Sequence, residues 1–232
     1  MTSSLRSMLL ALVSALTVAI PLGLAVPASA QTKLKLVLNW KYQGPQGMFF
    51  LADDRGYFKA EGLDVTIDQG SGSGAAVPLV ANGTYDVGFG DINALIELAA
   101  KKPDDAPIAV YVMFNQPPFT VAVKGFLKAL NHGIKDAIAD PKAAVDAVAA
   151  REPLIKPEIE RAKFEATLAE EMSHPEIGKI GLGDISDERM GKAIEILVKA
   201  KELPRIPTVG EVFDRSFLPP AADRPTSVRA AM

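Results

Sequence analysis

Along residues 33–123 the hydrophobic pattern changes repeatedly between the period of a strand and the period of a helix. Leu63, Val65 and Ile67 alternate with polar residues, as in a half-buried strand. Other apolar runs predict further strands at 33–38, 85–89, 107–114 and 119–123. Apolar residues at helical spacing predict helices at 48–55, 75–82 and 92–99. Strands and helices that alternate through short connections indicate an α/β fold with a mainly parallel sheet.

From Gly125 onward the pattern is typical of helices only. Leu127, Leu130, Ile134 and Ile138 recur at spacings of three and four, which predicts one amphipathic helix. Further helices are expected to begin at Pro141, at Pro157 and after Ser186. The chain therefore divides into an N-terminal α/β lobe at 31–124, a C-terminal helical segment at 125–224 that packs on the same lobe, and a disordered tail at 225–232.

The first 30 residues have the pattern of an export signal. Arg6 precedes an apolar run from Met8 to Ile20, and Ala28-Ser29-Ala30 has the small residues of a cleavage site. The run is almost long enough for a membrane anchor, but the helix breakers Pro21 and Gly23 interrupt it. We expect a signal peptide at 1–30, cleaved after Ala30, and a mature protein in the bacterial periplasm.

Composition excludes several classes of function. The chain has 232 residues, a net charge of −3 and no basic cluster, which argues against binding to nucleic acid or an anionic membrane surface. It contains no cysteine, so thiolate nucleophiles, thiolate metal ligands and disulfides are excluded. The two histidines, His132 and His174, lack the spacing of a metal site. We therefore expect no cofactor, no metal and no catalytic residues, and predict that the protein is not an enzyme.

Polar residues follow three of the predicted strands. Asn39-Trp40 comes after the first strand, the turn Asp68–Gly74 after the second, and Gly90-Asp91 after the third. Ligands of open parallel sheets bind beyond the carboxyl ends of the strands, so these three segments are expected to share one crevice. In the turn, Ser71, Gly72 and Ser73 would present hydroxyls and backbone N–H groups to a polar or anionic ligand. The alternative is a flexible connection in which Ser73 only caps the next helix.

Two of these residues have a second interpretation as well. The Trp40 indole stacks on a flat ligand or packs on Tyr42 or Phe49. The Asp91 carboxylate accepts a hydrogen bond from a ligand N–H or caps the helix that starts at Ile92. A carboxylate in a shielded crevice repels nitrate and sulfonate, which slightly favours an amino-substituted ring as ligand.

Five short motifs carry a resemblance to a known family. They are Leu38-Asn39-Trp40, Gly56-Tyr57-Phe58 with Glu61–Val65, Asp68–Ser73, Asp86–Asp91 and Phe217–Pro220. In these the chain resembles periplasmic solute-binding proteins of ABC importers, in the branch that serves nitrate, sulfonates, taurine and thiamine-pyrimidine precursors. The resemblance implies a periplasmic-binding-protein-like type II lobe and delivery of a small solute to an ABC permease in the inner membrane. The ligand-binding residues that we predict are Asn39, Trp40, Tyr42, Gln46, Ser71, Gly72, Ser73, Asp91 and Tyr111.

The chain departs from this family in length. Such proteins have two α/β lobes and on the order of 300 residues, and the segment that builds the second lobe is expected to be largely absent near Lys124. Without this lobe we expect the solute to be bound weakly. We expect a monomer, or a dimer if the missing lobe leaves apolar surface exposed. The expected solute is a thiamine-pyrimidine-like precursor. The alternatives are taurine, another sulfonate or nitrate, or a truncated remnant without transport activity. Related synthases of the thiamine pyrimidine use cysteine and histidine clusters with iron, so a synthase is not expected.

Overall fold

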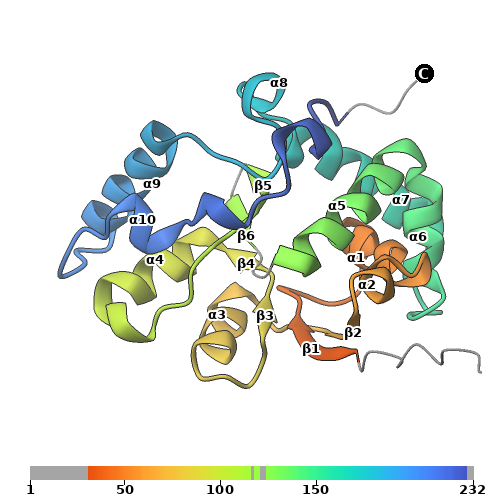
Figure 1. Cartoon of the computed structure of the whole chain (residues 1–232), viewed down its shortest axis with the longest axis horizontal. Helices are drawn as coiled ribbons and strands as arrows, with labels where there is room; N and C mark the ends of the chain where they lie inside the picture. Colours follow the sequence, from red (N-terminus) through yellow and green to blue (C-terminus); the bar gives the residue numbers. More distant parts are fainter. Residues whose placement is uncertain (1–30, 116–117, 121–123, 229–232) are drawn as a thin grey trace, which may run out of the picture.

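The computed structural model describes residues 31–115, 118–120 and 124–228 (Figure 1). The signal peptide expected at 1–30, with its cleavage after Ala30, lies outside the described residues, as does the end of the strand expected at 119–123. Within the described ranges, no helix combines the length and the apolar character that a membrane span needs.

The first half of the described chain alternates strands with helices, as the hydrophobic pattern predicts. The alternation of Leu63, Val65 and Ile67 with polar residues is confirmed, since these three are more buried than Asp64 and Thr66 between them. In order, the elements are β1 (Thr32–Val37), η1 (Gly44–Gln46), α1 (Gly47–Asp54), α2 (Tyr57–Ala60), β2 (Leu63–Asp68), α3 (Ser73–Ala81), β3 (Val87–Gly88), β4 (Gly90–Asp91), α4 (Ile92–Lys101), η2 (Pro103–Asp105), β5 (Val112–Asn115) and β6 (Pro118–Thr120).

From residue 124 the elements of the described chain are helical. Two of the predicted helix starts use side-chain caps: Asp140 accepts a hydrogen bond from Ala143 N, and Ser186 accepts one from Arg189 N. The elements are α5 (Lys124–Ala139), α6 (Pro141–Ala149), α7 (Pro157–Ala166), the π-helical turn η3 (Thr167–Met172), α8 (Ile177–Ile180), α9 (Asp187–Ala200), α10 (Val209–Val212), η4 (Arg215–Phe217) and η5 (Ala221–Asp223).

A parallel sheet lies at the N-terminal end of the fold, as predicted. Its strand order is β2-β1-β3, and β1 pairs in parallel with both neighbours. In this register Val37 lies opposite Asp68 of β2 and Gly88 of β3. The carboxyl ends of the three strands therefore meet at one edge of the sheet.

A second sheet is antiparallel, which the sequence pattern did not predict. Its strand order is β4-β6-β5. The predicted strand 85–89 is short, because the chain leaves the parallel sheet after Gly88 and Gly90-Asp91 starts the second sheet as β4. Between them, the buried ring of Phe89 packs against Phe49 and Phe114, each at a centroid distance of 5.2 Å. A continuous apolar run does not show which of two sheets each residue joins.

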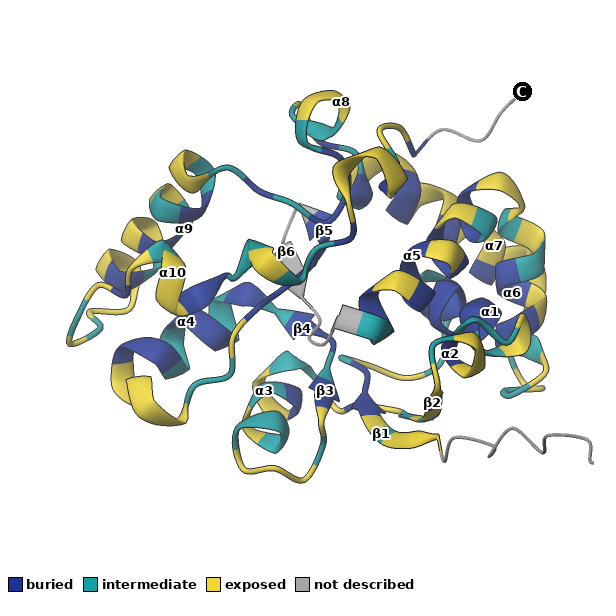
Figure 2. Ribbon diagram, viewed as in Figure 1, coloured by how far each residue is buried: buried dark blue, intermediate teal, exposed yellow. Residues whose placement is uncertain are grey.

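The larger hydrophobic core lies between the parallel sheet and the returning helices. The stripe Leu127, Leu130, Ile134 and Ile138 on α5 is confirmed, since all four are buried, and α5 packs against α1 and α2 (Figure 2). Phe126 stacks on Phe58 of α2 at 4.9 Å. Gly133 lets α5 approach closely, because a Cβ there would lie 2.5 Å from Ala52 Cβ. Helix α6 packs against both α1 and α5.

A smaller core holds the last long helix. Ile92 and Ile96 of α4 pack with Ile194 of α9 and with Phe213, and all four are buried. At the surface of this contact, Glu97 of α4 accepts hydrogen bonds from Lys101 of the same helix and Lys201 at the end of α9, at 2.7 and 2.6 Å. Thus α5, at the start of the C-terminal helical segment, packs on α1 and α2, whereas α9 and α10, near its end, pack on α4.

The tail expected to be disordered from residue 225 is ordered as far as Val228. Leu182 N donates a hydrogen bond to Pro225 O at 2.8 Å, and Val228 is buried in the larger core. The polar composition of this segment suggested disorder, but one backbone hydrogen bond and one apolar side chain hold it in place. Residues 229–232 lie outside the described part.

Substitution of Glu97 tests the contact between α4 and α9. The two lysines lower the pKa of Glu97 to about 2, so its charge stabilises the fold above about pH 4.5, and that stabilisation is lost as the pH falls toward 2. We expect Glu97→Gln to lower the free energy of unfolding by about 0.5 kcal/mol at pH 7, since the pairs are solvent-exposed. Chemical denaturation at pH 7 and pH 3 measures the difference, which is expected to shrink at pH 3.

Glu195→Gln is the control for this prediction. Glu195 lies exposed on α9, and its carboxylate forms no ion pair with the described residues. Equal losses of stability in the two variants, or a loss in Glu97→Gln that does not depend on pH, would contradict the role assigned to Glu97.

Candidate ligand-binding site

Three segments meet at the carboxyl ends of the parallel strands, and we call them the strand-end rim: residues 38–40, 69–73 and 89–91. The pairing of β1 with β2 continues past both strands. Leu38 N donates to Asp68 O at 2.9 Å, Gly70 N to Trp40 O at 3.0 Å, and Gly72 N to Asn39 O at 2.8 Å. The segment that carries Asn39 and Trp40 therefore lies alongside the glycine-rich turn.

This close approach depends on Gly70. A Cβ at this position would lie 1.8 Å from the carbonyl oxygen of Leu38, well inside van der Waals contact. The Gly-Ser-Gly-Ser pattern was interpreted as a source of hydroxyl and N–H groups. The structure shows a second requirement, which is room for the neighbouring backbone. Sequence reasoning did not single out Gly70 for this reason.

The third segment of the rim is held against the first two by its backbone. Phe89 N donates to Val37 O at 2.9 Å. A Cβ on Gly90 would lie 3.7 Å from Ser73 Cβ, so β4 begins beside the first residue of α3. The structure thus brings Asn39, Trp40, the turn with Ser71, Gly72 and Ser73, and Asp91 to one edge of the sheet.

Trp40 presents its indole to solvent. The side chain is 47% exposed. The alternative was that it packs on Tyr42 or Phe49, but the Tyr42 ring packs edge-on against Phe50 at 4.8 Å and the Phe49 ring packs on Phe89. A half-exposed tryptophan beside a polar turn is available to stack on a flat ligand.

Gln46 contributes a buried hydrogen-bond acceptor on a side chain that is hydrogen-bonded to Asn39. Its Nε2 donates to Asn39 Oδ1 at 3.2 Å, and the residue is only 3% exposed. Its Oε1 is buried and makes no hydrogen bond to any described residue. Leaving such an oxygen unsatisfied costs roughly 1–3 kcal/mol, and a ligand N–H group is the kind of donor that would remove this cost.

Asp91 caps helix α4, whereas helix α3, which follows the glycine-rich turn, has no side-chain cap. Asp91 Oδ1 accepts a hydrogen bond from Asn93 N at 2.9 Å at the start of α4. Its Oδ2 makes no hydrogen bond within the described chain, so one oxygen is left for a ligand. At α3 the N-cap is Gly72, with φ 111°, and Ser73 is the first helical residue. The alternative in which Ser73 caps this helix is therefore not observed.

The two predicted tyrosines are placed differently from the rest of the set. The Tyr42 hydroxyl donates to Ile67 O at 2.7 Å, and burial raises its pKa. Tyr111 is fully buried, its ring touches Gly183, and its hydroxyl lies 3.4 Å from Asn131 Oδ1. Burial also raises the pKa of Tyr111. Tyr111 is thus a core residue, and its prediction as a ligand contact is wrong, because an all-apolar strand pattern does not show which side chains reach solvent.

The described residues do not fit the iron site, made of cysteine and histidine clusters, that resemblance to the synthases implies. Within 31–115, 118–120 and 124–228, no three His, Asp or Glu side chains are arranged to hold a metal ion. The ring of His132 packs against Tyr57 at 5.2 Å, and His174 is buried beside Arg189.

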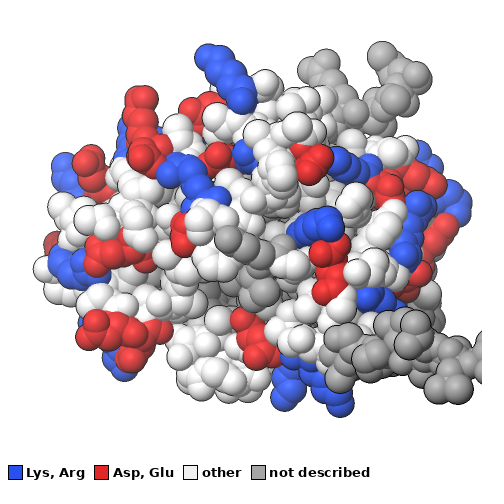
Figure 3. All heavy atoms as spheres, in the orientation of Figure 1, with Lys and Arg blue, Asp and Glu red and all other residues white. Residues whose placement is uncertain are grey.

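Acidic and basic side chains are interspersed over the face seen in Figure 3, which agrees with the lack of a basic cluster in the sequence.

Comparison with known proteins identifies relatives for part of the chain. Residues 46–124 match the family described as NMT1/THI5 like. The 4-amino-5-hydroxymethyl-2-methylpyrimidine phosphate synthase THI11 of Saccharomyces cerevisiae is 31% identical over 88 residues, which are 38% of this chain and 25% of that protein. The synthase of Schizosaccharomyces pombe is 28% identical over 104 residues, which are 45% of this chain and 28% of that protein. The chain thus spans about a quarter of the length of these curated relatives.

A solved structure shows the same fold. It is a conserved gene product of Candida albicans with the generic periplasmic binding protein fold, and it matches with a TM-score of 0.58 at 13% identity, over 81% of this chain and 98% of that chain. The predicted periplasmic-binding-protein-like fold is therefore confirmed.

The prediction that the protein is not an enzyme is contradicted by the relatives. The curated proteins that match are named as pyrimidine phosphate synthases. The prediction depended on the lack of cysteine and of histidines with the spacing of a metal site, and such residues are not required by every enzyme.

Substitution of Gly70 tests the geometry of the rim. Gly70→Ala places a methyl group against the Leu38 carbonyl, so we expect it to separate the two backbone segments and to lower the free energy of unfolding by about 2 kcal/mol. Gly74→Ala is the matched control, since a Cβ there meets nothing within 4 Å. Thermal unfolding and the emission maximum of Trp40 are the measurements. Equal behaviour of the two variants would show that the close contact at Gly70 is not required.

Proposed function

We propose that the protein binds a thiamine-pyrimidine-type ligand, a flat heterocycle that carries an amino group, at the strand-end rim. The observation that carries this proposal is the unsatisfied Gln46 Oε1, on a side chain hydrogen-bonded to Asn39, which precedes the half-exposed Trp40 in the chain. The match of residues 46–124 to the NMT1/THI5 like family and the names of the yeast relatives support the pyrimidine class.

Each part of such a ligand has a matching group at the rim. The ring stacks on Trp40. The amino group donates to Gln46 Oε1 and to the second oxygen of Asp91, while Asn39 supplies a further polar contact. A carboxylate near the ligand disfavours sulfonate and nitrate, because like charges repel strongly in a partly shielded site.

Delivery of the bound ligand to an ABC permease in the inner membrane is the second part of the proposal. The sequence pattern of residues 1–30, which predicts an export signal, supports the proposal of a periplasmic protein. Periplasmic binding proteins close around their ligand, whereas Trp40 at this rim is 47% exposed. We therefore propose binding that is weaker than micromolar, by a protein that is a monomer in solution.

The names of the relatives favour one other function, synthesis of the pyrimidine phosphate. This function is tested by incubating the protein with candidate precursors and searching for a phosphorylated pyrimidine product by mass spectrometry. Detection of catalytic turnover would assign the rim to a substrate rather than to a transported solute.

Binding is measured through the intrinsic fluorescence of the chain, because Trp40 is its only tryptophan. We expect 4-amino-5-hydroxymethyl-2-methylpyrimidine to quench this emission with a dissociation constant on the order of 100 µM, and taurine and nitrate to leave it unchanged. Gln46→Leu removes the buried acceptor and is expected to weaken binding about tenfold.

The control is Gln43→Leu, since the Gln43 side chain makes no hydrogen bond within the described structure. The proposal fails if Gln46→Leu binds the pyrimidine as tightly as Gln43→Leu, or if an anion binds more tightly than the pyrimidine.

A further inference from the structure

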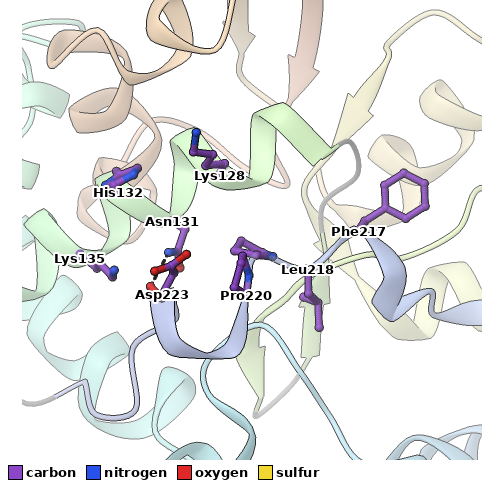
Figure 4. Close-up of a pocket in the computed structure, with 9 residues that line it drawn as sticks. Lys128, Asn131, His132, Lys135, Phe217, Leu218, Pro220 and Asp223 are labelled. Carbon is purple, nitrogen blue, oxygen red and sulfur yellow. Dashed lines mark hydrogen bonds between the residues drawn. The ribbon is translucent and has the colours of Figure 1, made fainter.

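A second cavity lies away from the strand-end rim, between α5 and the end of the chain. It encloses about 360 Å³, a volume in the range of small-molecule sites. None of the rim residues lines it. One wall is the exposed face of α5, and the other is the segment that leads into η5 (Figure 4). The lining residues are Lys128, Asn131, His132, Lys135, Phe217, Leu218, Pro219, Pro220 and Asp223.

The wall from the C-terminal segment is apolar and held in place. Leu218, Pro219 and Pro220 form most of it, and the proline rings restrict the backbone. Asn131 of α5 is 2% exposed, and its Nδ2 donates to Asp223 O at 2.8 Å. This hydrogen bond ties the two walls together, so the cavity is formed before any ligand binds.

The charged side chains of the cavity differ in how they are paired. Lys128 forms an ion pair with Glu61, the C-cap residue of α2, at 2.8 Å. The nearby Asp136 is paired with Arg55. By contrast, Lys135 and Asp223 form no ion pair with any described residue, and they come from opposite walls of the cavity (Figure 4). Among the described residues, the cavity therefore combines a lysine and an aspartate without ion pairs with an apolar surface beside them (Figure 4).

We propose that this cavity binds an α-amino acid with an apolar side chain. The ligand carboxylate pairs with Lys135, the ligand ammonium pairs with Asp223, and the side chain packs on Leu218, Pro219 and Pro220. A zwitterion matches both free charges at once. An organic anion without an ammonium group would leave its charge close to the Asp223 carboxylate.

Three related ligands separate the parts of this proposal. The full chain is titrated by isothermal calorimetry with L-phenylalanine, with 3-phenylpropionate, which lacks the ammonium group, and with phenethylamine, which lacks the carboxylate. We expect phenylalanine to bind and each of the other two to bind at least tenfold more weakly. Lys135→Gln and Asp223→Asn are each expected to weaken phenylalanine binding at least fivefold.

Lys199→Gln on α9 and Asp105→Asn in η2 are the matched controls, since both residues are exposed and lie outside the cavity. The far-UV circular dichroism of each variant verifies folding. Absence of phenylalanine binding at millimolar concentration, tighter binding of 3-phenylpropionate than of phenylalanine, or equal binding by cavity and control variants would each overturn the proposal. Because the cavity shares no residue with the rim, these outcomes are independent of pyrimidine binding.

Discussion

The pairing of β1 with β2 and its continuation beyond both strands is the interaction on which the site depends. Parallel strands in register bring their carboxyl ends to the same edge, and Val37 lies opposite both Asp68 and Gly88. The hydrogen bonds from Gly70 and Gly72 then extend this pairing to Asn39 and Trp40. Without the room that Gly70 leaves for the Leu38 carbonyl, the indole and the glycine-rich turn would not share an edge.

The C-terminal segment completes the fold that the N-terminal elements begin. Within the described residues the parallel sheet has three strands, and helices α1 and α2 both pack against α5. Helix α5 makes these contacts through Phe126 and its apolar stripe, while α9 and α10 pack against α4. Residues far apart in the sequence thus form each of the two cores, and the segment after 124 is part of one folded unit rather than an appendage.

At the strand-end rim and beside it, some polar groups already make hydrogen bonds within the fold, whereas others make none with the described residues. Asp91 caps α4 with one oxygen, and Tyr42 uses its hydroxyl to bind Ile67 O, so neither is wholly available. Gln46 is different, because its side-chain oxygen is buried away from water and has no hydrogen-bond partner among the described residues. Groups of this kind are stabilised by a ligand, and for that reason they are better indicators of a site than exposed polar residues.

The sequence by itself determined the order and type of the longer helices and of the parallel strands, and the three segments that the rim collects. Alternation in β2, the stripe on α5, the proline at Pro141 and the cap at Ser186 are local patterns, and local backbone geometry follows from them. Only the tertiary structure decided that Gly90-Asp91 starts an antiparallel sheet, that Tyr111 is in the core, that Val228 is anchored and that Lys135 and Asp223 line one cavity. These outcomes depend on contacts between residues distant in the chain, and periodicity along the chain carries no information about such contacts.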